Sequence, residues 1–222
     1  MLIKLDKVLA VDEFQKVHHQ AQQARYVAGS TTAGESSRSR KHNLQISEND
    51  PALPELQKIV LAALRRHPVL QFLAVPKHIM PPMFNRYDTG MYYQDHVDFS
   101  LVGANEKIRT DLSVTLFLSG QDEYDGGELI VSSPDGEQAI KLDRNEAIIY
   151  PSGQLHRVET VRRGSRHAAI TTIQSFIRHE SQRELLADLM RLARAIQDRA
   201  PQSDEARLAN KIHANLLRLW AE

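Results

Sequence analysis

Three side chains in the middle of the sequence are of types that bind a divalent metal ion. His96 and Asp98 stand two residues apart in the stretch YYQDHVDFS, and residues i and i+2 of a β-strand point to the same face of a sheet. An H-x-D pair alone is weak evidence, because chance supplies about half of one in a chain of this composition. A third ligand is available from His156, which begins the run LHRVETV after a turn. Two histidines and one carboxylate form the facial triad of non-haem Fe(II) oxygenases, which leaves three coordination positions open.

Two of those positions suit the keto-acid end of a 2-oxo acid and the third suits dioxygen. The far carboxylate of such a diacid needs a cation, and a guanidinium binds it through two parallel hydrogen bonds. Arg166 is the candidate. We expect VETVRRGSRHAAI to form a hairpin with the three-residue loop 162–164 and with Gly164 in the left-handed conformation. In that register His156 lies opposite Ile170, and Arg166, roughly 13 Å further along the strand, faces the same interior. A loop of two or four residues would turn Arg166 outward.

The composition excludes several other kinds of site and partner. The chain has 222 residues, with 28 lysines and arginines against 28 aspartates and glutamates, so no net field favours nucleic acid or an anionic membrane. It has no cysteine, which excludes disulfides, thiolate nucleophiles, iron–sulfur clusters and cysteine zinc sites. It also has no apolar leader and no run of about 18 apolar residues. We therefore expect a soluble, cytoplasmic protein without a membrane or nucleic-acid partner.

The N-terminal part of the sequence predicts two helices separated by a loop. Apolar residues recur at helical spacing over Val11–Ala28 and again from Pro54 to Pro68, where the proline closes the helix. The stretch Gly29–Asp50 is polar and rich in serine, which predicts a mobile loop that could act as a lid. The basic cluster SRSRKH at its centre could contact an anionic substrate, but the pattern favours a solvated loop.

The rest of the chain predicts strands followed by a helical tail. Val69–Ile177 contains nine short runs rich in Val, Ile, Leu, Thr and Tyr, divided by turn residues and without intervening helices, which favours a sandwich or jelly roll. Residues 181–200 and 203–222 then show two amphipathic helical patterns, each opened by a serine. Their apolar stripes fit packing on the core, and a homo-oligomer through these helices is left open.

The order of these motifs resembles a known enzyme family. The set comprises Tyr87, Gly90, Tyr93, His96-x-Asp98, the DGGEL motif at 125–129, His156 and Arg166. It is similar to the Fe(II)/2-oxoglutarate dioxygenases of the prolyl 4-hydroxylase type. The chain length, the wording HVDFS and the helical tail resemble, more closely, the bacterial PKHD-type hydroxylases.

The resemblance implies a set of ligands and a reaction. It implies that His96, Asp98 and His156 bind Fe(2+), that Arg166 and Tyr87 bind 2-oxoglutarate, and that L-ascorbate keeps the iron reduced. The implied reaction consumes dioxygen and couples decarboxylation of 2-oxoglutarate to succinate and CO2 with hydroxylation of a C–H bond. Many animal and algal prolyl hydroxylases carry a lysine where Arg166 stands, so the substrate of those enzymes is not assigned to this chain. A peptidyl proline or lysine and a siderophore or other small molecule stay open as substrates.

The implied fold is α+β and mainly β, a double-stranded β-helix (jelly roll) with N-terminal helices packed on it and a C-terminal helical tail. We expect residues 1–77 to form the N-terminal helices and first strands of the dioxygenase domain, 78–177 its core, and 178–222 the helical region. Two other functions fit parts of the pattern. One is a cupin-like metal-binding or sensing module without oxygenase activity, and the other is a metal-free β-sandwich whose tail binds a partner.

Overall fold

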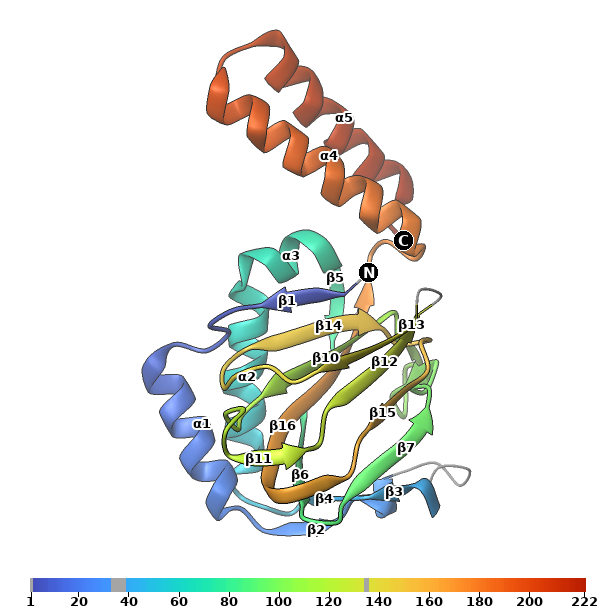
Figure 1. The fold of residues 1–222 in the computed structure, drawn as a ribbon. Helices are drawn as coiled ribbons and strands as arrows, with labels where there is room; N and C mark the ends of the chain where they lie inside the picture. Colours follow the sequence, from blue (N-terminus) through green and yellow to red (C-terminus); the bar gives the residue numbers. More distant parts are fainter. Residues whose placement is uncertain (1, 33–38, 134–135) are drawn as a thin grey trace.

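Two antiparallel sheets form the body of the protein, with the smaller sheet lying against one face of the larger (Figure 1). The computed structural model describes residues 2–32, 39–133 and 136–222. The larger sheet contains, in spatial order, β1 (Ile3–Leu5), β14 (Ala147–Pro151), β10 (Leu112–Phe117), β16 (Val161–Ser175), β6 (Met83–Asp88), β4 (Leu44–Ile46) and β2 (Tyr26–Ala28), and β5 (Pro76–Ile79) and β11 (Tyr124–Gly126) also pair with β16. The smaller sheet contains β13 (Gly136–Ile140), β12 (Leu129–Ser133), β15 (His156–Val158), β7 (Tyr92–His96) and β3 (Lys41–His42). The strands β8 (Leu101–Val102) and β9 (Ile108–Arg109) form a separate ribbon.

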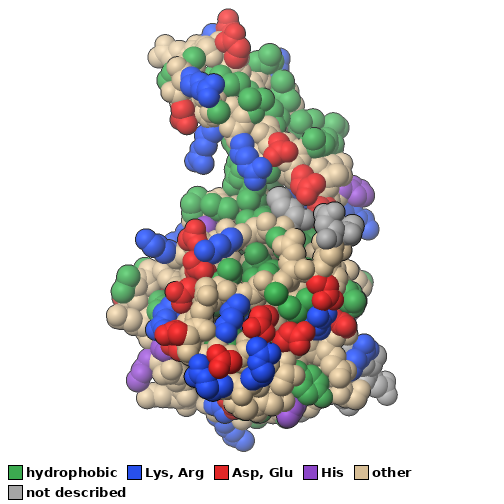
Figure 2. Space-filling model, in the orientation of Figure 1, with side chains coloured by type: hydrophobic (Ala, Val, Ile, Leu, Met, Phe, Trp, Pro, Cys, Tyr) green, Lys and Arg blue, Asp and Glu red, His purple; other side chains and the backbone are tan. Residues whose placement is uncertain are grey.

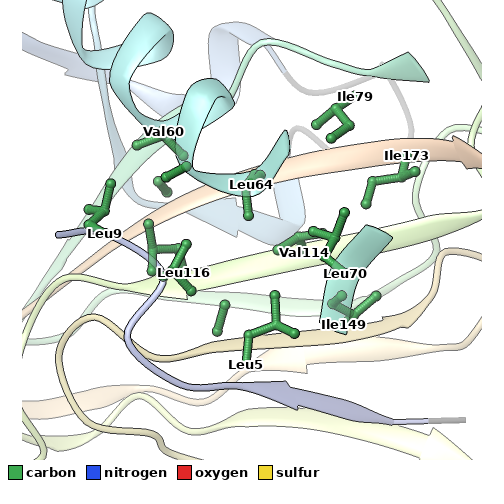
Figure 3. Packing of buried hydrophobic residues seen from close by; sticks show 14 of the residues in the cluster. Leu5, Leu9, Val60, Leu64, Leu70, Ile79, Val114, Leu116, Ile149 and Ile173 are labelled. Carbon is green, nitrogen blue, oxygen red and sulfur yellow. The ribbon is translucent and has the colours of Figure 1, made fainter. Parts of the chain in front are cut away.

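Helices cover the outer face of the larger sheet. They are α1 (Val11–Gln23), α2 (Leu53–Arg66) and the short α3 (Pro68–Ala74), and a 3-10 turn occupies Gly29–Thr32. The apolar stripe of α2, which includes Val60 and Leu64, packs toward Val114 and Leu116 of β10 (Figure 3). Alternate residues of a strand point to opposite faces, so Thr115 of the same strand points the other way, into the space between the sheets. The face of the larger sheet that lies under the helices therefore packs in the hydrophobic core, and the opposite face, toward the smaller sheet, is available for a site.

The last two helices form a hairpin that projects from the body. They are α4 (Glu180–Arg199) and α5 (Asp204–Trp220) (Figure 1). The C-terminus returns to the body, where the Glu222 amide donates to Phe176 O and Lys77 Nζ donates to Glu222 O. Hydrophobic side chains are exposed along the hairpin (Figure 2), including Leu185, Leu192 and Leu208. Within the described residues, no helix is long and apolar enough to cross a membrane.

The N-terminal half departs from the sequence prediction in three places. The run VLQFLAVP, predicted as a strand, forms α3, because Pro68 starts this helix instead of only closing α2 and the buried Leu70, Leu73 and Ala74 follow helical spacing. The first helix ends at Gln23 rather than Ala28 because the next residues form β2.

The prediction of a mobile loop over Gly29–Asp50 is also largely wrong. The second half of this stretch contributes β3 to the smaller sheet and β4 to the larger one. Residues 33–38 lie outside the described part of the chain. The predicted tail helices are confirmed, but only α5 has its serine cap, with Ser203 Oγ accepting from the Ala206 amide. The other helix, α4, begins after His179 without a side-chain cap.

Candidate active site

The two predicted histidines meet across a pair of neighbouring strands. His96 is the last residue of β7 and His156 the first of β15, and the two are paired directly in the antiparallel register. Their ring centroids lie 4.2 Å apart. Asp98 lies two residues beyond the end of β7, where its amide donates to Ser152 O. His156 Nε2 is 3.8 Å from Asp98 Oδ1, and one ligand atom from each of the three residues lies within 4.8 Å of the others. The prediction that Asp98 sits on the same strand as His96 is wrong, yet the three side chains converge.

Backbone contacts fix which nitrogen each histidine offers. His96 Nδ1 lies 2.8 Å from Gln94 O, and His156 Nδ1 lies 2.9 Å from Gln154 O. A carbonyl oxygen only accepts, so both Nδ1 atoms carry hydrogen and both Nε2 atoms keep a free lone pair. Burial and the neighbouring His156 also lower the pKa of His96 to about 4. This imidazole is therefore neutral at neutral pH, the form that binds a metal ion.

Two buried serines hold the carboxylate from behind. The Ser113 hydroxyl donates to Asp98 Oδ2 and lies 2.7 Å from the Ser152 hydroxyl. Ser113 belongs to β10 and Ser152 directly follows β14, so the larger sheet orients a carboxylate that the smaller sheet's strand delivers. Oδ2 is occupied by this contact, which leaves Oδ1 on the side of His156.

Arg166 is a fully buried cation, with 0% of its surface exposed. Among the described residues, none accepts a hydrogen bond from Nε, Nη1 or Nη2. The guanidinium carbon lies 5.4 Å from the ring centroid of Tyr87 and 5.2 Å from that of Phe117. A buried charge without an acceptor is costly unless a ligand supplies one. The guanidinium lines the same cavity as the two histidines, so a bound carboxylate would satisfy it.

The route by which Arg166 reaches the cavity differs from the predicted hairpin. His156 and Arg166 lie in different sheets, because the chain crosses after β15 and continues as β16. Gly164 has the expected positive φ of 76°, but it lies inside β16 and pairs with Tyr124 of β11. The hairpin register is therefore wrong. The inward orientation of Arg166 is nevertheless present, set by the pairing of β16 with β6, where Arg166 lies opposite Tyr87.

The DGGEL motif makes room for this arginine. Gly127 has a φ of 65°, and a Cβ on it would lie 3.2 Å from Arg166 Cδ and 3.0 Å from a Val161 methyl. At Gly126, with a φ of 72°, a Cβ would lie 2.2 Å from Thr160 O. The motif includes a β-bulge or similar irregularity, seen as a register shift between Asp125 and Gly126 in the pairing of β11 with β16.

The cavity between the sheets has a volume of about 110 Å³, the volume that roughly four water molecules take up in the liquid, so it suits a small ligand such as a short diacid. Tyr87 lines it and is 1% exposed, and burial raises the pKa of its hydroxyl to about 12. The hydroxyl is therefore a neutral donor. The Tyr93 ring stacks on the His96 ring with centroids 3.5 Å apart. Asp95 is exposed and pairs with Arg157.

Sequence reasoning missed three residues of this site. Ser113 could have been noticed as a polar residue that alternates with apolar ones in the run DLSVTLF, whereas Ser152 carries no such signal. Lys41 came from the segment interpreted as a solvated loop, yet it lines the cavity. Burial lowers its pKa to about 8.

Comparisons with known proteins identify the family and the fold of the chain. The family model of the 2OG-Fe(II) oxygenase superfamily matches residues 82–174. A PKHD-type hydroxylase of Gluconobacter oxydans is 41% identical over the whole of both chains. A 2OG-Fe(II) oxygenase family oxidoreductase from Burkholderia pseudomallei superposes with a TM-score of 0.58 at 16% identity, covering 81% of this chain and 86% of that one. A Trichoplax adhaerens prolyl hydroxylase, solved with a peptide fragment of hypoxia inducible factor, superposes with a TM-score of 0.54 at 14% identity, covering 83% and 86%. The two structures show a shared fold.

Proposed function

This chain belongs to the PKHD-type hydroxylases of the 2OG-Fe(II) oxygenase superfamily, and on that premise we propose that His96, Asp98 and His156 are its iron ligands and Arg166 its 2-oxoglutarate anchor. The protein is a 2-oxoglutarate- and Fe(II)-dependent dioxygenase that hydroxylates its substrate. Bound Fe(II) supplies the oxygen chemistry that couples conversion of 2-oxoglutarate to succinate and CO2 with C–H hydroxylation.

One observation carries the residue assignment. The three candidate ligands converge within 4.8 Å, and they share a cavity with a fully buried arginine whose nitrogens find no acceptor among the described residues. A metal ion requires the first feature and a diacid requires the second. A metal-binding module without oxygenase chemistry would have no use for the buried cation, so the pair of features favours the enzyme.

The protein's own groups prepare the site for both ligands. His96 and His156 each present a neutral Nε2, since their Nδ1 hydrogens are held by backbone carbonyls. Ser113 holds one carboxylate oxygen of Asp98, which fixes the direction of the other. Burial excludes water from Arg166 and so strengthens its attraction to a carboxylate. Burial keeps the Tyr87 hydroxyl protonated, so in this proposal it donates a hydrogen bond to the bound diacid.

Several finer assignments belong to the same proposal. The two facing sheets support a double-stranded β-helix (jelly roll). In this proposal residues 1–77 are the N-terminal helices and first strands of the dioxygenase domain, 78–177 its core, and 178–222 a helical region. L-Ascorbate is proposed as the reductant that maintains Fe(II), on the strength of the family resemblance. A peptidyl substrate is supported by the peptide bound to the Trichoplax neighbour, and a small molecule is the other candidate class.

The test is consumption of 2-oxoglutarate by the purified protein with Fe(II), ascorbate and oxygen. We expect slow formation of succinate even without a substrate, and none above background with His156→Ala. His19→Ala is the matched control, because His19 is exposed on α1 and should retain wild-type turnover. A wild-type protein that binds iron but forms no succinate would argue for a metal-binding module instead.

A further inference from the structure

The helical hairpin of α4 and α5 carries an apolar surface that the proposed chemistry does not use. Leu185 and Leu192 of α4 are 57% and 56% exposed, and Leu208 and Leu219 of α5 are 54% and 74% exposed. On both helices these residues belong to a series with intervals of four, three and four positions. The series are Leu185, Leu189, Leu192, Ile196 on α4 and Leu208, Ile212, Asn215, Leu219 on α5. This spacing is typical of helices that pack along other helices.

Both series lie on the same side of the hairpin. Ala193 and Ala209 are buried at nearly the same distance from the turn that joins the helices, so they mark the line along which α4 and α5 pack. Each of them directly follows an exposed leucine, Leu192 or Leu208, and one residue turns a helix by about 100°. Because the helices run antiparallel, equal offsets from the packing line place both leucines on one face. We call this surface the hairpin face, and hydrophobic side chains are visible along the hairpin (Figure 2).

The hairpin face is large enough to hold two proteins together. The 20 residues of α4 span about 30 Å, and two helices side by side are roughly 20 Å wide. The face therefore covers about 600 Å², and two such faces in contact would bury about 1,200 Å², the lower end of the range for stable complexes. An exposed apolar patch of several hundred Å² is itself typical of an interaction site.

The charges at the outer edges of the face are complementary to those of a second copy. From the turn toward the body, α4 carries Arg199 and then Asp188, whereas α5 carries Asp204 and then Lys211, and all four are exposed. Each lies three, four or seven residues from a leucine of the hairpin face, which places it at the edge of that face. The order of charge is therefore opposite on the two helices. Asp188 and Lys211 differ in height by about 6 Å, which a lysine side chain can span.

From these features we propose that a second copy of this chain covers the hairpin face, so that two hairpins form a four-helix bundle. The two-fold axis runs along the hairpins, and α4 of one copy lies on α5 of the other. Arg199 of one copy then meets Asp204 of the other, and Asp188 meets Lys211. A second copy matches the face in length, in the spacing of its apolar residues and in the order of its charges, as the self-complementary interface of a symmetric dimer requires.

Sedimentation velocity of the full-length protein tests the proposal. We expect wild type to sediment as a dimer, at twice the 25.2 kDa of the chain, with a Kd of about 1 μM or tighter. Leu192→Gln combined with Leu208→Gln should raise the Kd about 100-fold or more, because the dimer loses the burial of four leucines. Circular dichroism checks the fold of this variant, and the exposure of both leucines in the single chain lets glutamine replace them without loss of helix.

Arg191→Gln combined with Arg207→Gln is the matched control. These exposed arginines directly precede the two leucines, so they point away from the hairpin face. Their ion pairs with Asp188 and Asp204 lie within single helices and contribute little to stability. The control should keep the wild-type Kd.

A charge exchange tests how the two hairpins are oriented. Lys211→Glu places a carboxylate beside Asp188 of the other copy and should weaken the dimer several-fold. Adding Asp188→Lys should restore most of the affinity, because opposite charges then face each other again.

Several results would overturn the inference. They are a wild-type monomer at concentrations up to about 100 μM, an oligomer other than a dimer, a dimer unaffected by the leucine substitutions, and loss of the dimer in the arginine control. If the charge exchange binds no better than Lys211→Glu alone, the packing of α4 on α5 is wrong. Each result is read from the mass of the particle, so the proposed function is tested separately.

Discussion

Replacing Arg166 by methionine should stabilise the ligand-free protein. The arginine is completely buried, and its nitrogens lack acceptors within the described residues. The effective cost of burying such an ion is several kcal/mol, which contacts of the guanidinium with Tyr87 and Phe117 offset by about 1 kcal/mol each. Methionine fills similar space without a charge. We expect the free energy of unfolding to rise by about 2 kcal/mol, or a melting temperature higher by roughly 4 to 8 °C.

The same substitution should abolish the response to 2-oxoglutarate. With Mn(II) in place of Fe(II) to prevent turnover, 2-oxoglutarate at about 100 times its Kd should stabilise wild type by about 2.7 kcal/mol. Arg166→Met should gain almost nothing at that concentration. Scanning calorimetry with and without the ligand measures both effects on one sample.

Arg183→Met is the matched control. Arg183 is also buried, but its Nη1 donates to Ile177 O at 2.7 Å and to Arg178 O at 2.9 Å. Losing these bonds should cost about 1 to 3 kcal/mol of stability, and the stabilisation by 2-oxoglutarate should stay at the wild-type value. The reasoning is refuted if Arg166→Met is destabilised in the same way and still responds to 2-oxoglutarate.

Three further predictions concern the metal ligands and a buried histidine. His96→Ala should abolish the rise in melting temperature that Mn(II) gives wild type, because the ion then stabilises the native state little; an unchanged rise would place the metal elsewhere. Ser113→Ala should weaken Mn(II) binding about 10- to 100-fold in a titration by freeing Asp98 Oδ2, and unchanged affinity would deny the serine a positioning role. Burial lowers the pKa of His167 to about 4, so the unfolded chain takes up this proton near pH 6.5 and the native state only near pH 4. Stability should be full above pH 6.5 and fall by about 3 kcal/mol as the pH drops to 4, and His167→Gln should remove this part of the slope in urea unfolding.

Residue types and local spacing were enough to predict the chemistry of the site. The H-x-D pair, the later His156 and an arginine chosen by its spacing predicted an iron and 2-oxoglutarate site. The family comparisons support these two ligands for the protein, and the assignment of individual residues stays a prediction. Helical periodicity also predicted the first two helices and the tail, since an amphipathic stripe is a property of consecutive residues.

Predictions that needed a long-range pairing failed or came out right for a different reason. The hairpin that was to place Arg166 does not exist, because β15 and β16 belong to different sheets. The stretch 29–50 contributes strands because partners forty or more residues away, in β6 and β7, pair with its backbone. The composition of a segment contains no information about which distant strand has an edge available for pairing with it.

The sequence by itself determined which groups can bind iron and a diacid, because ligand chemistry is a property of residue type. Tertiary structure decided how those groups meet. It placed His156 opposite His96, turned Asp98 against Ser113, buried Arg166 without an acceptor from the described chain, and brought Lys41 to the cavity wall. Each of these depends on contacts between strands far apart in the chain, whose register is set by the packing of whole sheets rather than by local pattern.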